Sequence, residues 1–273
     1  MLPVIRAEAL TPAMVLLDAR SRAAYAAGHL EGARNADVDL DLAEVGDPSR
    51  GGRHPLPPLD RWLRQLGAWG IGPSTQVVAY DDQMGANAAA RAWWMLRAIG
   101  HEQVAVLEGG LQAAVAQGRH VTAEVPQVVA LPPYPRLSAS AWQLPTVDID
   151  TVDALRTNPE WKVLDVRSAP RFRGETEPID PIAGHIPGAV NLPFSENLTG
   201  DRFKSAEELR AQYEKLLGST TPDHLVVHCG SGVTACHTLL ALELAGLHGA
   251  SLFVGSWGEW CRNDRSRATG ERA

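Results

Sequence analysis

The sequence predicts an α/β protein of two tandem domains, each a mostly parallel sheet with helices on both faces. Three observations lead to this. The chain has 273 residues, which suits two domains of about 100–200 residues each. Short apolar segments alternate with longer helical ones, which is typical of a parallel sheet covered on both sides. A set of motifs also occurs twice, in the same order, in the two halves of the chain.

The repeat sets the expected domain boundaries. Four segments of the first half recur in the second half, with register shifts of a few residues. They are 16–21 with 163–168, 27–35 with 183–191, 77–81 with 225–229 and 107–110 with 253–256. The period is far too long for a solenoid, so two homologous domains are the simplest account. We therefore expect domains over 1–124 and 146–273, joined by an extended, proline-rich surface linker over 125–145.

The elements of the first half follow from its apolar runs. Strands are expected over 15–18, 76–80 and 104–107, where the residues are apolar and bounded by polar or glycine-containing segments. The alanine-rich segment 88–99 separates the second and third of these strands and is expected to be a helix.

The second half repeats this order, with strands expected over 162–166, 225–228 and 251–253. Ser205 and Glu208 have the spacing of an N-terminal capping box, so a helix should begin there. It runs to Leu217 and ends at Gly218. A second helix is expected over 233–245. The polar residues from Arg262 onward are expected to form a loose tail.

Charge and composition exclude several classes of partner. The net charge is -7 and no basic run stands out, which disfavours nucleic acid. No apolar run approaches the ~20 residues of a membrane span, and the N-terminus lacks the apolar core of a signal peptide. The three cysteines fit no disulfide framework or paired zinc motif, so we expect no metal. A reducing cytoplasm, where a free thiol stays usable, is the expected location.

Residues 225–235 (LVVHCGSGVTA) place Cys229 where a buried strand passes through a tight loop into a helix. Backbone N–H groups at a helix start are unpaired and stabilise a thiolate. Gly230 and Gly232 allow the loop conformations that other residues resist. Ligands of open α/β sheets bind at the carboxyl ends of strands. We therefore expect a nucleophilic cysteine in an anion-binding cradle. Cys236 and Cys261 are expected to be structural or bystander thiols.

The neighbours of Cys229 narrow the chemistry. A phosphatase loop of the Cys-x5-Arg type needs an arginine where Ala235 stands. A protease needs a general base, and His228 should point to the opposite face of its strand. Sulfur transfer needs less: a thiolate attacks a donor sulfur, holds it as a persulfide among N–H groups, and passes it to an acceptor.

The loop 229–235 resembles the active-site loop of rhodanese-type sulfurtransferases, in particular the 3-mercaptopyruvate and thiosulfate group of bacteria. Further motifs of that family are matched by residues 92–94, 107–110, 165–168, 171–174, 177–178, 183–193 and 255–260. The resemblance implies a non-catalytic first domain packed on a catalytic second one, without a cofactor. Asp81 occupies the place of the cysteine in the first half, and a carboxylate cannot carry a sulfane sulfur.

The resemblance also implies site residues. Arg171 matches the first substrate arginine of the family, whereas Ile179 stands near the second, so Arg173 is a candidate substitute. Ser231 matches a loop serine that assists proton movement. The family pairs that serine with an aspartate of the first domain, for which Asp39 is the best match ahead of two competitors, Asp37 and Asp41.

The remaining expected substrate contacts come from the loop and from one histidine. They are Gly230, Gly232, Val233 and Thr234 of the loop, and His54, which resembles a histidine near the interdomain cleft of the family.

The donor is expected to be 3-mercaptopyruvate. Thiosulfate-preferring members carry basic residues after the cysteine, where this chain has Gly230 and Ser231. The sulfur would pass to a thiol, such as a reduced thioredoxin-like protein or glutathione, or to cyanide, with release of pyruvate. Two alternatives stay open: thiosulfate as donor to the same Cys229, and a sulfur-carrier or regulatory binding module without turnover.

Overall fold

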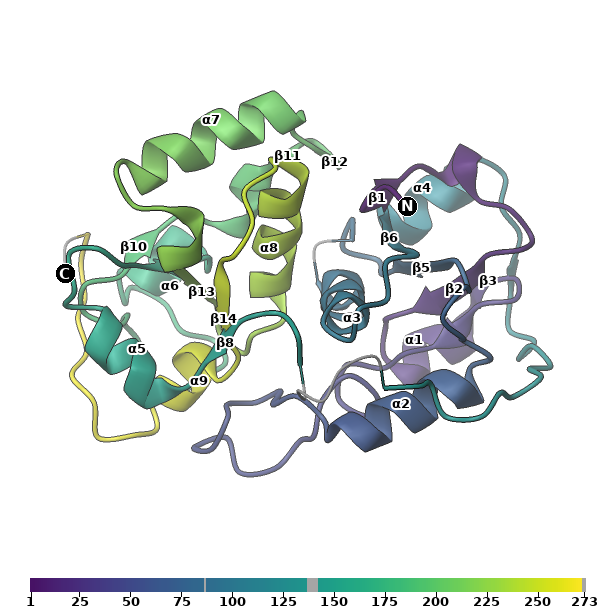
Figure 1. Ribbon diagram of the computed structural model, residues 1–273, viewed down its shortest axis with the longest axis horizontal. Coiled ribbons are helices and arrows are strands. Elements are labelled where there is room, and N and C mark those ends of the chain that lie inside the picture. The colour runs from purple at the N-terminus through teal and green to yellow at the C-terminus, as the bar shows by residue number, and fades with distance from the viewer. Residues whose placement is uncertain (86, 137–141, 272–273) are drawn as a thin grey trace. The chain divides into compact units, whose positions relative to one another are not determined.

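The computed structural model describes residues 1–85, 87–136 and 142–271 and is shown in Figure 1. The chain divides into two compact units. The first contains Met1–Glu44 and Leu56–Leu144, and the second contains Val45–Pro55 and Pro145–Ala273. The segment Val45–Pro55 therefore leaves the first half of the sequence and belongs to the second unit. Residues 137–141 of the expected linker lie outside the described residues.

The first unit is built on a parallel five-stranded sheet in the order β1-β6-β5-β2-β4. Its strands are β1 (Val4–Ile5), β2 (Val15–Asp18), β4 (Arg34–Asn35), β5 (Val77–Tyr80) and β6 (Val104–Leu107). Its helices are α1 (Arg22–Ala27), α2 (Leu59–Ala68), α3 (Ala88–Arg97) and α4 (Gly110–Ala116), with a 3-10 turn at Ala7–Ala9. The short strands β3 (His29–Leu30) and β7 (Val121–Thr122) pair antiparallel beside this sheet.

The second unit has a parallel sheet in the order β10-β9-β13-β14-β8. Its strands are β8 (Thr146–Val147), β9 (Lys162–Asp165), β10 (Val190–Asn191), β13 (Leu225–His228) and β14 (Ser251–Phe253). Its helices are α5 (Ile149–Leu155), α6 (Ala169–Phe172), α7 (Ala206–Leu217), α8 (Thr234–Leu244) and α9 (Ser256–Trp260), with 3-10 turns at Phe194–Asn197 and Pro222–His224. A small hairpin joins β11 (Leu198–Thr199) to β12 (Arg202–Phe203).

The two sheets have the same strand arrangement. When the second order is taken in reverse, β8, β14, β13, β9 and β10 correspond in turn to β1, β6, β5, β2 and β4, so β5 and β13 are both central. Helices lie on both sides of each sheet in Figure 1. The predicted fold class is therefore confirmed. The central strands are buried along their whole length, as their unbroken apolar sequences require.

Most predicted elements lie within two residues of their expected bounds, and α7 has the predicted capping box. The outer strands β1, β4, β8 and β10 were not predicted. Each has two residues, which is too short for a periodic apolar pattern.

The expectation of a loose tail after Arg262 is wrong. Ala268 pairs with His185 through two backbone hydrogen bonds, and Gly270 N–H donates to the carbonyl of Arg173. Arg265 forms an ion pair with Asp153 of α5 at 2.6 Å. Polar residues can thus be ordered by backbone pairing and ion pairs, which composition alone does not show.

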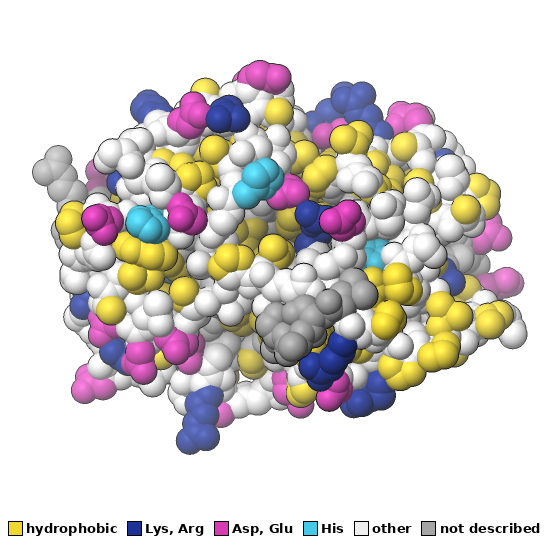
Figure 2. Space-filling view, viewed as in Figure 1, with side chains coloured by type: hydrophobic (Ala, Val, Ile, Leu, Met, Phe, Trp, Pro, Cys, Tyr) yellow, Lys and Arg dark blue, Asp and Glu magenta, His cyan; other side chains and the backbone are white. Residues whose placement is uncertain are grey.

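Surface and helix properties are unremarkable for a chain of this charge. Acidic and basic side chains are interspersed on the face shown in Figure 2. Among the described residues, none of the helices combines the length and the apolar character that a membrane crossing requires.

The capping box of α7 provides a test of the fold. The Ser205 Oγ accepts from Glu208 N–H at 3.2 Å, and the Glu208 carboxylate accepts from Ser205 N–H at 2.8 Å. Ser205→Ala should lower the free energy of unfolding by about 1 kcal/mol, because one helix N–H loses its acceptor. Urea unfolding measures the change. Ser219→Ala, in the exposed turn after α7, is the control and should change stability by less than ~0.5 kcal/mol. Equal losses in the two variants would contradict the cap.

Candidate active site

Cys229 lies at the carboxyl end of the central strand β13, five residues before α8 begins. The side chain is 2% exposed. The N–H of Ser231 points at its Sγ from 3.5 Å. Gly232 has a φ of +72°, and a Cβ there would lie 2.5 Å from the Val254 carbonyl oxygen. The sequence therefore folds locally into a tight loop that places the thiol against the backbone N–H of Ser231.

The segment after β14 holds this loop from one side. Cys229 N–H donates to Ser256 Oγ at 3.1 Å, and that hydroxyl donates to the Phe253 carbonyl at 2.9 Å. Trp257 N–H and Gly258 N–H donate to the carbonyls of Cys229 and Gly230. Ser256 has a φ of +55°, which is rare for a non-glycine residue. The unfavourable backbone conformation therefore occurs at the residue whose hydroxyl holds the Cys229 N–H.

The first unit has a loop at the equivalent position, after β5, that holds a carboxylate in place of a thiol. Asp81 follows β5 as Cys229 follows β13. The Asp81 carboxylate accepts four backbone N–H groups at 2.8–3.1 Å, those of Gln83, Gly85, Asn87 and Ala89. Burial raises the pKa of Asp81, and the four backbone hydrogen bonds oppose that rise, so the loop favours a carboxylate that the chain's own side chain supplies.

A chain of buried ion pairs runs beside the Cys229 loop. Arg167 forms a bidentate pair with Asp165, and its third nitrogen lies 3.2 Å from Glu177. Glu177 binds Arg171 at 2.6 Å. Arg171 in turn lies 3.7 Å from Asp180. We call this set, completed by the two other arginines on Asp180, the arginine–carboxylate network; its members are Arg53, Asp165, Arg167, Arg171, Glu177, Asp180 and Arg262.

Two carboxyls of this network stay ionised although they are buried. Burial alone would raise the pKa of Asp165, but the charge and the hydrogen bonds of Arg167 outweigh it and hold that pKa below its ordinary value. Burial likewise opposes ionisation of Glu177, yet hydrogen bonds from Arg171 and from backbone N–H groups lower its pKa. Both carboxyls are therefore ionised at neutral pH, and the alternating positive and negative side chains of the network stay paired.

The imidazole of His228 contacts Asp165 of this network and the backbone of Cys229. Its Nδ1 lies 3.1 Å from the Cys229 carbonyl oxygen, and its Nε2 lies 3.9 Å from Asp165. Burial lowers the pKa of the imidazole, so His228 is neutral at pH 7. Its contacts agree with the expectation that it does not act as a base on Cys229.

Both halves of the chain match one family of known domains. The family model described as "Rhodanese-like domain" matches residues 6–117 and 148–263. The chain belongs to the rhodanese-like family.

The chain is similar to proteins named 3-mercaptopyruvate sulfurtransferase and to proteins named thiosulfate sulfurtransferase. A Pseudomonas aeruginosa protein named "Probable 3-mercaptopyruvate sulfurtransferase" is 43% identical over 250 residues, covering 90% of this chain and 86% of the relative. The Gallus gallus "Thiosulfate sulfurtransferase" is 37% identical over 227 residues, covering 81% of this chain and 75% of the relative. The solved 3-mercaptopyruvate sulfurtransferase from Leishmania major matches with a TM-score of 0.79 at 31% identity, covering 92% of this chain and 70% of that one.

In this rhodanese-like chain, two arginines converge on the residue after the cysteine. A Cβ built on Gly230 would lie 2.9 Å from Arg53 Nη2 and 3.4 Å from Arg171 Nη2. Arg171 was expected from the sequence. Arg53 was missed, because it belongs to the first half of the sequence and only the fold brings it into the second unit. Its one sequence signal is its place beside His54.

The other expected residues are distributed differently. Ser231, Gly232 and Val233 form the buried loop, and Thr234 opens α8. The Arg173 guanidinium pairs with Glu175 at 2.7 Å on the surface and not with a residue of the Cys229 loop. His54 belongs to the same unit as Cys229, whereas Asp39 belongs to the first unit.

The two remaining cysteines are buried and bonded. Cys236 Sγ donates to the Gly232 carbonyl at 3.3 Å, at the base of the loop. Burial raises the pKa of the Cys261 thiol, which keeps it protonated and unreactive. Cys229 is thus the thiol that has a backbone N–H, that of Ser231, directed at its sulfur.

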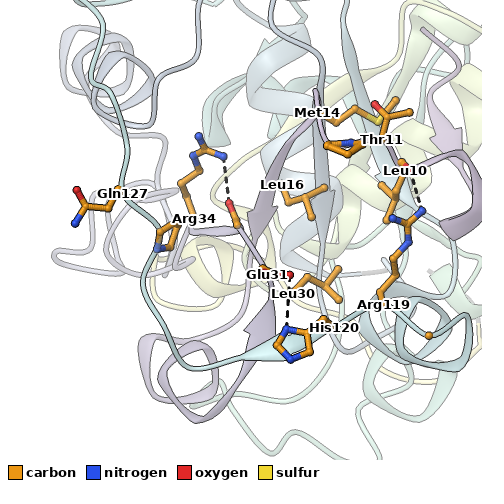
Figure 3. A pocket seen from close by; sticks show the side chains of 14 residues that line it. Leu10, Thr11, Met14, Leu16, Leu30, Glu31, Arg34, Arg119, His120 and Gln127 are labelled. Carbon is orange, nitrogen blue, oxygen red and sulfur yellow. Dashed lines mark hydrogen bonds and ion pairs between the residues drawn. The ribbon is translucent and has the colours of Figure 1, made fainter.

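Two cavities among the described residues lie away from Cys229. One of about 570 Å³ in the first unit has Arg34 and Arg119 on opposite sides, as Figure 3 shows. Another of about 560 Å³ in the second unit is lined by Arg173 and Val190 among others. Neither contains Cys229, so the site is identified by its loop and its charges.

The left-handed glycine of the loop gives the first prediction for the site. Gly232→Ala should destabilise the protein by at least ~2 kcal/mol, since the added carbon meets the Val254 carbonyl as well as an unfavourable φ. Gly200→Ala is the matched control: its φ is +66° with no atom within 4 Å, so only the backbone cost of about 1 kcal/mol applies. Chemical denaturation compares the two. A Gly232 variant no less stable than the Gly200 variant would argue against the tight packing.

The lowered pKa of Glu177 gives a second prediction for the site. A carboxyl whose pKa is lower in the folded state stabilises above its ordinary pKa of about 4.3, and this stabilisation is lost as pH falls through the folded-state value. Glu177→Gln should therefore cost ~3 kcal/mol at pH 7, and the difference from wild type should shrink below pH ~4. Glu160→Gln, at an exposed position, should cost little at any pH. A pH-independent loss in Glu177→Gln would contradict this account.

Proposed function

We propose that the protein is a sulfurtransferase that takes a sulfane sulfur from 3-mercaptopyruvate onto Cys229 and passes it to a thiol or to cyanide. The observation that carries this is the Cys229 loop, in which backbone N–H points at the sulfur and two guanidiniums face the next residue. The names of the relatives support the same activity. The first domain, with Asp81 filling its own cradle, is inactive in this proposal.

The chemistry proceeds in two transfers. The Cys229 thiolate attacks the donor sulfur, and an S–S bond forms as the C–S bond breaks. The electron pair stays on carbon as the enolate of pyruvate, which takes up a proton. An acceptor thiolate then attacks the outer sulfur, and Cys229 leaves as a thiolate. Between these steps the outer sulfur is anionic, and the N–H groups of the loop stabilise it as the first-unit loop stabilises Asp81.

Several residues have proposed parts in this scheme. Arg171 binds the donor carboxylate, and the backbone of Gly230, Gly232, Val233 and Thr234 surrounds the reacting sulfurs. Ser231 assists the proton transfer, with Asp39 as its proposed partner and His54 near the donor. Arg173 is the weaker candidate for the donor, since it already pairs with Glu175.

Thiosulfate is the second candidate donor, and one observation favours it. Two guanidiniums face Gly230, and two cationic groups suit the recognition of a dianion such as thiosulfate. The second guanidinium also weakens the alternative of a binding module without turnover, because the site then offers two groups that can hold a donor anion.

The proposed setting is the reducing cytoplasm, where the three free cysteines would stay reduced. The acceptor is a reduced thioredoxin-like protein, glutathione or cyanide. The catalytic domain is proposed to be 146–273, the non-catalytic one 1–124, and 125–145 the linker.

Intact-mass measurement after mixing with each donor tests the function. Wild type should gain the mass of one sulfur atom, Cys229→Ser should gain none, and Cys261→Ser should behave as wild type. We expect kcat/KM for 3-mercaptopyruvate to exceed that for thiosulfate by at least about tenfold. A larger value for thiosulfate would favour the second donor, and sulfur loading of Cys229→Ser would refute the mechanism.

A further inference from the structure

The segment Val45–Pro55 is anchored on the second unit near the Cys229 loop. Gly51 N–H donates to the Glu259 carboxylate at 2.8 Å, and Asn263 donates to the Ser49 carbonyl at 3.0 Å. Gly52, at a φ of +79°, lies so close to the Gly255 carbonyl that a side chain would collide with it. Gly255 directly precedes Ser256, which holds Cys229. The segment therefore has a defined place beside the reactive loop.

Arg53 extends from this segment onto a buried carboxylate. Its Nε donates to Asp180 Oδ1 at 3.1 Å, and the Asp180 side chain is fully buried. Arg262 donates to the same oxygen at 2.7 Å, which fixes Asp180 in turn. The guanidinium of Arg53 is thus held at one edge while its Nη2 faces Gly230. Its side chain remains 21% exposed, so a small ligand can reach it.

The charges of the arginine–carboxylate network do not cancel. Its four arginines share three carboxylates, so one positive charge is in excess. Arg171 is bound by Glu177 through both Nε and Nη2. Arg53 has its carboxylate contact through Nε, and its Nη2 lies closer than any Arg171 nitrogen to the space over Gly230. The excess charge is therefore available where a donor's anionic group would lie beside Cys229.

We propose that Arg53 is the second anion-binding residue of the site and takes the place of the arginine that is absent at Ile179. It binds the carboxylate of the donor together with Arg171, and Asp180 positions it. Gly230 leaves the space for both guanidiniums because it has no side chain. This inference rests on the proposed function for the identity of the donor, but the positive charge beside Cys229 can be measured without any sulfur transfer.

Alkylation of Cys229 measures that charge directly. Iodoacetate and iodoacetamide form the same C–S bond with loss of iodide, and they differ in that only iodoacetate carries a carboxylate. The rate of modification at Cys229 is followed by peptide mass spectrometry. In Arg53→Ala the iodoacetate-to-iodoacetamide rate ratio should fall by about tenfold relative to wild type. Arg53→Lys should recover part of it, and the iodoacetamide rate should change by less than about twofold in both variants.

Arg50→Ala is the matched control, since Arg50 is an exposed arginine of the same segment. It should leave the ratio unchanged. An Arg53→Ala ratio within about twofold of wild type, in protein with the wild-type circular dichroism spectrum, overturns the proposal. If Arg53→Ala fails to fold, the Lys variant decides: its ratio should lie below wild type, and an equal ratio counts against the role of the bidentate guanidinium.

Steady-state kinetics separate this inference from the proposed function. Arg53→Ala should raise KM for 3-mercaptopyruvate by about tenfold with kcat changed by less than about twofold, as expected for loss of uniform binding. If wild type transfers sulfur and Arg53→Ala keeps its KM, the inference fails and the function stands. If wild type accepts no sulfur while the alkylation ratio still falls, the function fails and the anion site stands.

Discussion

The site depends on the buried pair between Asp165 and Arg167. Both side chains are at most 1% exposed, and a buried charge without a partner is strongly destabilising. Each further charge of the network is fixed by the need to pair its neighbour, so Glu177 follows Arg167, and Arg171 follows Glu177. The position of the arginines beside the cysteine loop is therefore a consequence of charge pairing that begins at the carboxyl end of β9.

Comparison of the repeats shows how the two loops differ at the proposed anion site. The first unit has the same starting pair, Asp18 with Arg20 at 2.6 Å, and Arg20 also donates to the carbonyl of Gly28 as Arg167 does to Gly184. The four N–H bonds of its loop are taken by Asp81. In the second unit, residues 171–180 add further ion pairs to the starting pair. Cys229 stands where the first unit has Asp81. In the proposed function, the loop after β13 then stabilises the transferred sulfur.

Local patterns predicted what depends on neighbours in sequence. The central strands, the capping box at Ser205 and the loop at Cys229 were all predicted because each is a short motif with its own physical cause. Arg53 was not, because a repeat places it in the first domain, whereas the fold transfers its segment to the second. The two-residue outer strands and the ordered tail depend on long-range pairing that composition does not contain.

The central claim is that Cys229 takes the sulfur from 3-mercaptopyruvate as pyruvate leaves. A single-turnover experiment without acceptor tests it most directly, with enzyme in slight excess over donor and with pyruvate and protein mass followed in the same quenched samples. The account predicts that one pyruvate appears for each chain that gains a sulfur atom, at the same rate, with the added sulfur on the Cys229 peptide. Pyruvate formed without a mass gain, or sulfur found on another residue, would contradict it.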